Sequence, residues 1–199
     1  MRRRDILLLL LVMLVAGASV DVALPWRTNQ SPQSADPTPR PSVILEVTHT
    51  TFSIFENSEN KYLYLRVLSD GSIECQSPFP IEKSESNERR SYRKILTQEE
   101  FKALQSLIDQ PQILKIQPKY RAYVSVDTSS EWGIKLQHHG ETQRIVVGMF
   151  SPGLAREFKQ PYPKALTKLG CTVQKLRHEV VGDPAEHIDS DCKKVLQLE

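Results

Sequence analysis

The stretch from Tyr62 to Cys75 reads Tyr-Leu-Tyr-Leu-Arg-Val-Leu-Ser-Asp-Gly-Ser-Ile-Glu-Cys. Apolar residues, many of them aromatic or β-branched, alternate with polar ones on both sides of an Asp-Gly pair at residues 70 and 71. An Asp-Gly pair between alternating apolar runs is the strongest short-range signal for a β-hairpin. The stretch therefore predicts two antiparallel strands joined by a tight turn.

The register of this hairpin follows from the faces of its strands. A two-residue loop would set Val67 opposite Glu74 and place a charge on the apolar face. A three-residue loop from Ser69 to Gly71 instead pairs Val67 with Ile73, with Gly71 in the left-handed position after a type I turn. The same register pairs Leu65 with Cys75, and the expected core-facing residues are Leu63, Leu65, Val67, Ile73 and Cys75. The other face, expected to meet solvent or a partner and hence the candidate binding face, carries Tyr62, Tyr64 and Arg66.

The N-terminus has the pattern of a secretory signal peptide. Three arginines at 2–4 precede a Leu-rich run from Ile6 to Val15, and small residues follow up to Ala18, where we expect cleavage. The alternative is an uncleaved membrane anchor, but Asp21 interrupts the apolar run before it reaches the roughly 20 residues that a span needs. The expected location is therefore secreted or periplasmic, with anchoring through this segment as the alternative.

Composition divides the chain into four parts. A signal peptide at 1–18 is followed by a Pro- and Ser-rich linker at 19–41, a single domain at 42–182 and an acidic tail at 183–199. Removal of 1–18 takes away three of 26 basic and one of 24 acidic residues, which leaves 23 of each and a net charge of zero. A neutral chain lacks the electrostatic footprint of a general nucleic-acid binder.

The remaining elements predict an α+β fold. Further strands are expected at 43–51 and 89–95, and a second hairpin is expected to pair Leu136 with Ile145 across a Gly140-Glu141 turn. A capping box at Thr97 and Glu100 starts a helix that ends near Asp109, and a longer helix runs over 163–181. We expect a mainly antiparallel sheet of about five to six strands, covered on one face by two helices.

The three cysteines are Cys75, Cys171 and Cys192, and export makes a disulfide plausible. Cys75 lies on the expected core face, so its position is explained by a buried thiol without a disulfide. Cys171 is rotated away from the apolar stripe of the long helix, and the chain after Gly182 is long enough to double back to it. Three pairings are possible, of which Cys171–Cys192 is favoured.

No catalytic, cofactor or metal residue is assigned. His138 and His139 are adjacent on a strand and therefore point to opposite faces. A looser C-terminal set has no recognised metal-ligand spacing: His178, His187, Asp189, Asp191 and Cys192. The sequence has neither a nucleophile elbow nor a glycine-rich phosphate loop, and Asp127 is interpreted as a turn residue.

The order of these elements resembles a family of small bacterial exported domains of unknown function. The likeness spans residues 52–181 and is carried by the strand with the Asp70-Gly71 turn, the Thr-x-x-Glu-Phe-x-x-Leu helix from Thr97, and a Tyr…Asp stretch at Tyr120 and Asp127. Two strands and a closing helix follow in the same order. The resemblance implies a location in the bacterial envelope or outside the cell, and no activity.

Two functional hypotheses follow. The first is a non-enzymatic binding module of the bacterial cell envelope, whose partner is an envelope protein or polymer. The alternative is a hydrolase or metal-dependent enzyme, which would need a pocket that joins at least two of Asp127, Glu131, His138 and His139.

Overall fold

The computed structural model describes residues 40–53, 55, 57–81, 88–120, 128–157, 162–183 and 187–197. The chain divides into two compact units after Arg40, and the fold given below is that of the unit from Pro41 to Glu199. The expected signal peptide and almost all of the expected linker lie outside the described residues. Within the described ranges no helix is long and apolar enough to cross a membrane.

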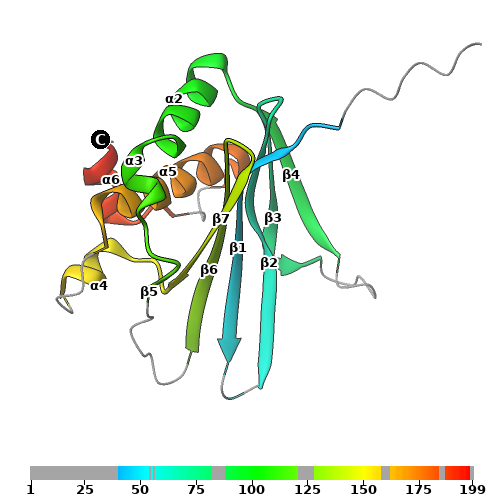
Figure 1. Cartoon of the computed structure of the whole chain (residues 1–199). Helices are drawn as coiled ribbons and strands as arrows, with labels where there is room; N and C mark the ends of the chain where they lie inside the picture. Colours follow the sequence, from blue (N-terminus) through cyan, green and yellow to red (C-terminus); the bar gives the residue numbers. More distant parts are fainter. Residues whose placement is uncertain are drawn as a thin grey trace, which may run out of the picture. The chain divides into compact units, whose positions relative to one another are not determined.

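Seven strands of the described chain form one sheet in the order β4-β3-β2-β1-β6-β7-β5 (Figure 1). Their bounds are β1 Val43–Ser53, β2 Ser58–Leu68, β3 Ser72–Pro80, β4 Arg89–Ile95, β5 Lys119–Tyr120, β6 Thr128–His138 and β7 Glu141–Gly148. All neighbours pair antiparallel except β5, which runs parallel to β7. The α+β class is confirmed, but the sheet is larger than expected, because the two-residue β5 is too short to show an alternating pattern.

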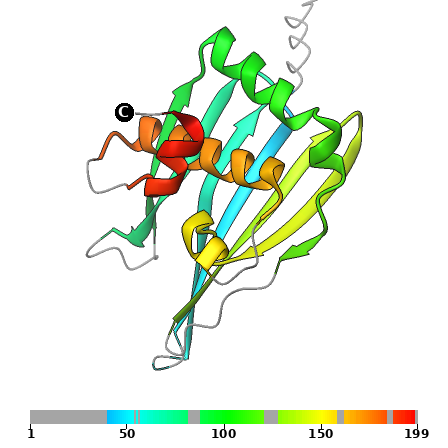
Figure 2. The same ribbon diagram turned by 90° about the vertical axis from the view of Figure 1, so that its left-hand side faces the viewer.

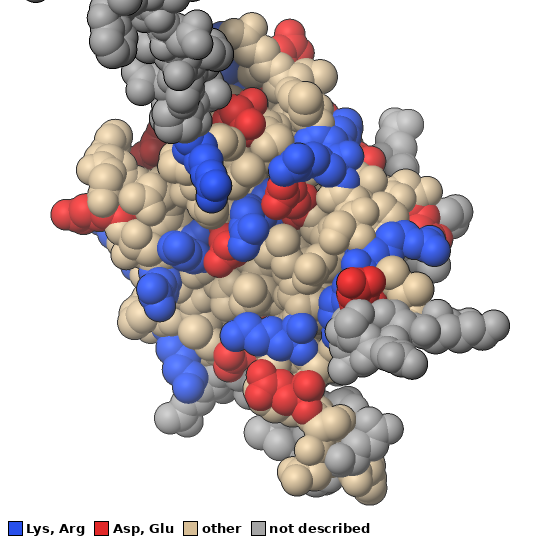
Figure 3. All heavy atoms as spheres, turned by 90° about the vertical axis from the view of Figure 1, so that its right-hand side faces the viewer, with Lys and Arg blue, Asp and Glu red and all other residues tan. Residues whose placement is uncertain are grey.

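Helices cover one face of this sheet and leave the other face open (Figures 1 and 2). Among the described residues they are α2 Gln98–Ile108, α3 Pro111–Leu114, α4 Pro152–Glu157, α5 Lys164–Val181 and α6 Ser190–Leu196. The two expected helices are α2 and α5, and α5 crosses the strands in Figure 2. The other three have four, six and seven residues, too few for a periodic pattern to reveal them. We call the uncovered side the open face (Figure 3).

Local sequence signals set the ends of both long helices. Thr97 Oγ1 accepts from Glu100 N at 3.2 Å and Glu100 Oε2 accepts from Thr97 N at 2.7 Å, which confirms the capping box. These hydrogen bonds from Thr97 lower the pKa of Glu100. Gly182 ends α5 in the left-handed conformation. Between these ends the predicted apolar stripe of α5 packs against the core: Leu166, Leu169, Val173 and Leu176 are buried, and Val180 is half-buried.

The turn of the first hairpin is confirmed. Val67 pairs with Ile73, Gly71 has φ +80° and its N–H donates to Leu68 O at 3.0 Å. Asp70 Oδ1 accepts from both the hydroxyl and the N–H of Ser72, which lowers the pKa of Asp70. The ladder between β2 and β3 stops after two pairs, so the expected pair of Leu65 and Cys75 is not formed.

For the part of β2 that precedes Leu65 in the chain, the expected assignment of side chains to the two faces is wrong. A β-bulge interrupts its pairing with β1, since Val47 pairs with Leu65 but the next residue, Thr48, pairs with Leu63. The extra residue is Tyr64, and it reverses the alternation of the residues before it. Tyr62 is therefore buried on the helix side with 8% exposure, and Tyr64 packs against the core. Of the expected outward-facing residues, only Arg66 keeps its predicted orientation.

The second hairpin has the predicted faces but not the predicted register. Ile134, not Leu136, pairs with Ile145. The turn is made by His139 and Gly140, with φ of 43° and 87°, which is the left-handed pair of a type I′ turn. The shift is two residues, so the same side chains still face the helices.

The disulfide Cys171–Cys192 is present, with 5.0 Å between the Cα atoms, and Cys75 is buried and takes no part in it. The bond joins α5 to α6, which lies within the expected acidic tail. Asp189 caps α6 by accepting from Asp191 N at 2.8 Å. Part of the tail is thus an ordered helix tied to the domain.

Candidate binding face

The open face carries six charged side chains in one row across six strands. The register sets each one opposite the next, and because directly opposed residues share a face, the row lies on one side of the sheet. From β4 to β7 the members of this charge row are Arg93, Glu74, Arg66, Glu46, Lys135 and Arg144. Figure 3 shows blue and red side chains alternating in a band across this face.

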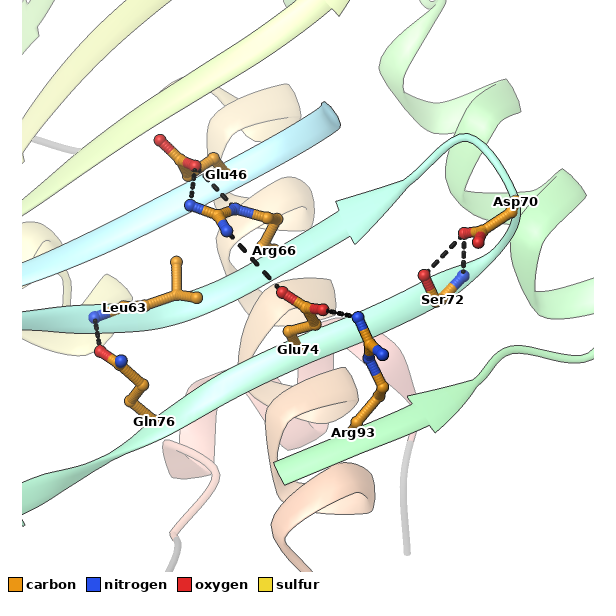
Figure 4. A network of polar contacts seen from close by, with 8 residues as sticks. All are labelled: Glu46, Leu63, Arg66, Asp70, Ser72, Glu74, Gln76 and Arg93. Atoms are coloured by element: carbon orange, nitrogen blue, oxygen red, sulfur yellow. Dashed lines mark hydrogen bonds and ion pairs between the residues drawn. The ribbon is translucent and has the colours of Figure 1, made fainter. Parts of the chain in front are cut away.

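Ion pairs hold the first four members of the charge row in place (Figure 4). Arg66 binds Glu46 Oε2 through Nε at 2.8 Å and Nη2 at 2.7 Å, and its Nη1 lies 3.7 Å from Glu74 Oε2. Arg93 pairs with the other oxygen of Glu74. Glu74 is thus bound by two cations and Glu46 by one, an arrangement that orders side chains which would otherwise be mobile.

The other end of the charge row is not neutralised. Lys135 faces Glu46 in the register, but that carboxylate is engaged by Arg66. Arg144 lies next to Lys135, on the far side from Glu46. In the part of the chain that the structure describes, neither Lys135 nor Arg144 forms an ion pair, so the row has two cations in excess.

Next to the charge row the sheet opens between β2 and β3. Past the pair of Arg66 and Glu74 the two strands separate, and side chains replace the missing ladder. Gln76 Oε1 accepts from Leu63 N at 3.0 Å (Figure 4). Arg177 of α5 donates to Tyr64 O at 2.7 Å and to Gln76 O at 2.9 Å. We call this region the sheet split, because side chains rather than backbone pairs join its two strands.

Two more side chains close the far end of the sheet split. Asn60 Nδ2 donates to Pro78 O at 3.2 Å. Arg89 Nη1 donates to Ser77 O at 3.2 Å, and the same guanidinium contacts Pro78 O and Asn60 Oδ1. Backbone carbonyls that the separated strands would leave without partners are thus satisfied by side chains.

A hollow of about 390 Å³ lies on the open face where the strands separate. Its described lining consists of Leu63, Arg66, Glu74, Cys75, Gln76, Ser91, Tyr92 and Arg93. Two guanidinium groups, a carboxylate, an amide and a hydroxyl thus border one depression, beside the buried Cys75. Glu74 already engages both guanidinium groups, so the hollow presents hydrogen-bond donors and acceptors together and is suited to a polar group of a partner.

The aromatic residues of β2 support this face from behind. The guanidinium of Arg177 lies 4.5 Å from the ring centre of Tyr64 and 5.6 Å from that of Tyr62. His49 Nδ1 is 2.9 Å from Tyr62 Oη. Burial, together with the nearby Arg177, lowers the pKa of His49 to about 4. Tyr62 and Tyr64 are therefore parts of the scaffold, and Arg66 alone of the predicted binding residues lies on the open face.

The candidate catalytic residues that the structure describes, Glu131, His138 and His139, are not brought together. Glu131 and His138 lie seven positions apart on β6 and so point to opposite faces. His138 is buried, with 5% exposure and its Nδ1 3.8 Å from Asp109 Oδ1, whereas His139 is exposed in the turn. Asp127 lies outside the described residues.

Three of the five possible ligands near the C-terminus have structural roles. Asp189 caps α6, Asp191 pairs with Lys194 at 3.2 Å, and Cys192 is oxidised. The described ranges contain no group of three or more His, Cys, Asp or Glu that could hold a metal ion.

Fold and site together define a seven-stranded α+β domain with helices on one side and an ordered charged surface on the other. No protein-family model matches the chain, and no curated protein matches it. Sequence reasoning missed the charge row because its members are far apart along the chain, and missed Arg177 because a lone arginine beside an apolar stripe carries no signal of burial. Only the pairing of six strands would have revealed the row.

Proposed function

We propose that this protein is a non-enzymatic binding module of the bacterial cell envelope that holds an envelope protein or polymer on its open face. The charge row carries the proposal. Its side chains are ordered by ion pairs before any partner arrives, which lowers the entropy lost on binding. Surface ion pairs contribute little stability by themselves, roughly 0–1 kcal/mol. Stabilisation of the fold therefore does not explain why the charge row is present.

The dimensions of the charge row favour a macromolecular partner. Neighbouring strands are about 4.8 Å apart, so six strands spread the row over roughly 24 Å. The excess of two cations at Lys135 and Arg144 favours a partner that carries acidic groups, and the polar hollow near the other end of the row offers such a partner hydrogen bonds. A protein segment or an anionic polymer meets this requirement.

Two observations support the proposed location outside the cytoplasm. The N-terminal pattern is that of a signal peptide, and the disulfide suits an oxidising compartment. We also propose that this chain belongs to the family of small bacterial exported domains, and this proposal depends only on the order of its strands and helices. An enzymatic function is not proposed, because Glu131 and His138 face opposite sides of β6.

The test compares two double variants with the same change in charge. Lys135→Glu/Arg144→Glu alters the open face without breaking an ion pair among the described residues, and Lys102→Glu/Lys193→Glu alters exposed sites on the helix side. Purified exported protein is mixed with isolated envelope wall and membrane fractions, and the bound amount is measured at rising salt.

We expect the wild type and the helix-side variant to bind in a salt-sensitive manner, and the open-face variant to lose about tenfold or more in affinity. Equal binding by both variants, or no binding by the wild type, would contradict the proposal.

A further inference from the structure

A cavity of about 600 Å³ lies among the helices, away from the open face. Pro152 of α4 and Tyr162 form part of its wall, residues of the first turns of α5 form another, and α6 supplies the third. Sites for small molecules typically measure about 300–1,000 Å³ and are mostly apolar with a few polar groups. We infer that this helix-side cavity binds a small anionic amphiphile, that is, an apolar body with one acidic group.

The apolar part of the cavity comes from three side chains. Pro152 and Tyr162 are buried, and Val195 of α6 is 43% exposed at the cavity. The hydroxyl of Tyr162 donates to Met149 O at 3.1 Å. The ring of Tyr162 is stacked on Phe150, so it forms a fixed apolar part of the wall against which a hydrocarbon or aromatic group can pack.

The charge of the cavity is positive. Lys164 and Lys168 lie one turn apart on α5, and Lys194 faces them from α6. Two like charges four residues apart destabilise a helix, and α5 has no acidic residue in its first turn to offset them. Among the described residues of the lining the one acid is Asp191, and its Oδ1 is 3.2 Å from Lys194 Nζ. An acidic ligand group would offset the remaining positive charge.

The disulfide preserves the shape of the cavity. Cys192 lies in α6 between Asp191 and Lys194, and its bond to Cys171 fixes α6 against α5. Gln174 Oε1 of α5 also accepts from Asp189 N at 3.0 Å, just before α6. The wall is therefore in place before a ligand binds, which reduces the ordering cost of binding. Reduction of the disulfide is expected to weaken binding without any change to the lining residues.

The probe is anilinonaphthalene sulfonate, which combines an aromatic body with one anionic group and fluoresces when bound. Competition by decanoate is compared with competition by decanol, its uncharged counterpart of the same chain length. Two variants change the cavity in different ways: Lys164→Glu/Lys168→Glu reverses the charge, and Thr167→Trp fills the space between these lysines at constant charge. Circular dichroism and urea unfolding establish that each variant is folded.

We expect one probe site in the wild type, displaced by decanoate and not by decanol. Both cavity variants should weaken probe binding by about tenfold or more, while Lys102→Glu/Lys193→Glu binds as the wild type does. No probe binding, equal displacement by decanol, or unchanged binding by the charge-reversed or the filled variant would overturn the inference. Lys135→Glu/Arg144→Glu should keep full probe binding, which separates this site from the open face.

Discussion

Replacement of Arg177 by Met tests how the sheet split is held together. The side chain is 1% exposed, its Nη1 and Nη2 donate to Tyr64 O and Gln76 O, and its guanidinium stacks 4.5 Å from the Tyr64 ring. Methionine has a similar length and packs adaptably, but it donates no hydrogen bond. Arg177→Met should therefore leave two carbonyls in the sheet split without these donors.

The expected loss of stability follows from these contacts. A buried carbonyl without its donor costs about 1–3 kcal/mol, and a desolvated cation–π contact contributes about 1–2 kcal/mol. The methionine variant recovers part of this lost free energy because it no longer buries a charged group. We expect a net destabilisation of about 3 kcal/mol, a large share of the 5–15 kcal/mol by which domains are typically stable.

Arg177→Lys is the matched control. It keeps the charge, but a single ammonium group cannot reproduce the planar fork that bridges two carbonyls. We expect it to lose about 1–2 kcal/mol, less than the methionine variant. The assay is urea unfolding with the disulfide intact, joined by hydrogen exchange of the amides in β2 and β3. The reasoning is refuted if Arg177→Met unfolds at the same urea concentration as the wild type, or if exchange in these strands is unchanged.

Three further predictions concern single positions. Folded His49 has a pKa of about 4, whereas an unfolded histidine has 6.5, so unfolding takes up a proton between these values. The free energy of unfolding should fall by roughly 2 kcal/mol as the pH is lowered from about 6.5 to 4. Urea titrations of His49→Gln at the same pH values should lack this pH dependence. Gly170→Ala would place Cβ 2.1 Å from Phe150 Cζ, in a ring stacked between two other aromatic rings. The clash should outweigh the better helix propensity of alanine and lower the free energy of unfolding by about 1–3 kcal/mol in the same assay. A more stable variant would show instead that the Phe150 ring moves aside without cost. Thr97→Ala should cost about 1 kcal/mol by removing the cap of α2, and Thr97→Ser should restore most of it in thermal unfolding.

Local signals in the sequence predicted much of the fold. Turn chemistry identified Gly71, side-chain capping identified the start of α2 at Thr97, and apolar periodicity identified the buried stripe of α5. Each signal arises from residues at most a few turns apart. The favoured pairing of Cys171 with Cys192 also depended on local reasoning, namely the rotation of Cys171 away from that stripe.

The errors occurred where a neighbour in space overrode the local pattern. The bulge at Tyr64 allows that side chain to stack on Arg177, which is 113 residues away in the sequence, and alternation within β2 contains no trace of it. The turn at His139 and Gly140 shifted the second hairpin by two residues because both residues adopt left-handed backbone. His139 is not a residue type that demands this conformation.

The sequence alone determined the α+β class, the first turn, both long helices and the three cysteines available for pairing. These depend on local backbone preference and apolar burial, which nearby residues encode. Tertiary structure alone decided the charge row, the sheet split and the helix-side cavity. Each joins residues from elements that are distant in sequence, and the electrostatic energy of such contacts depends on separation in space, which only the pairing of strands and the packing of helices establish.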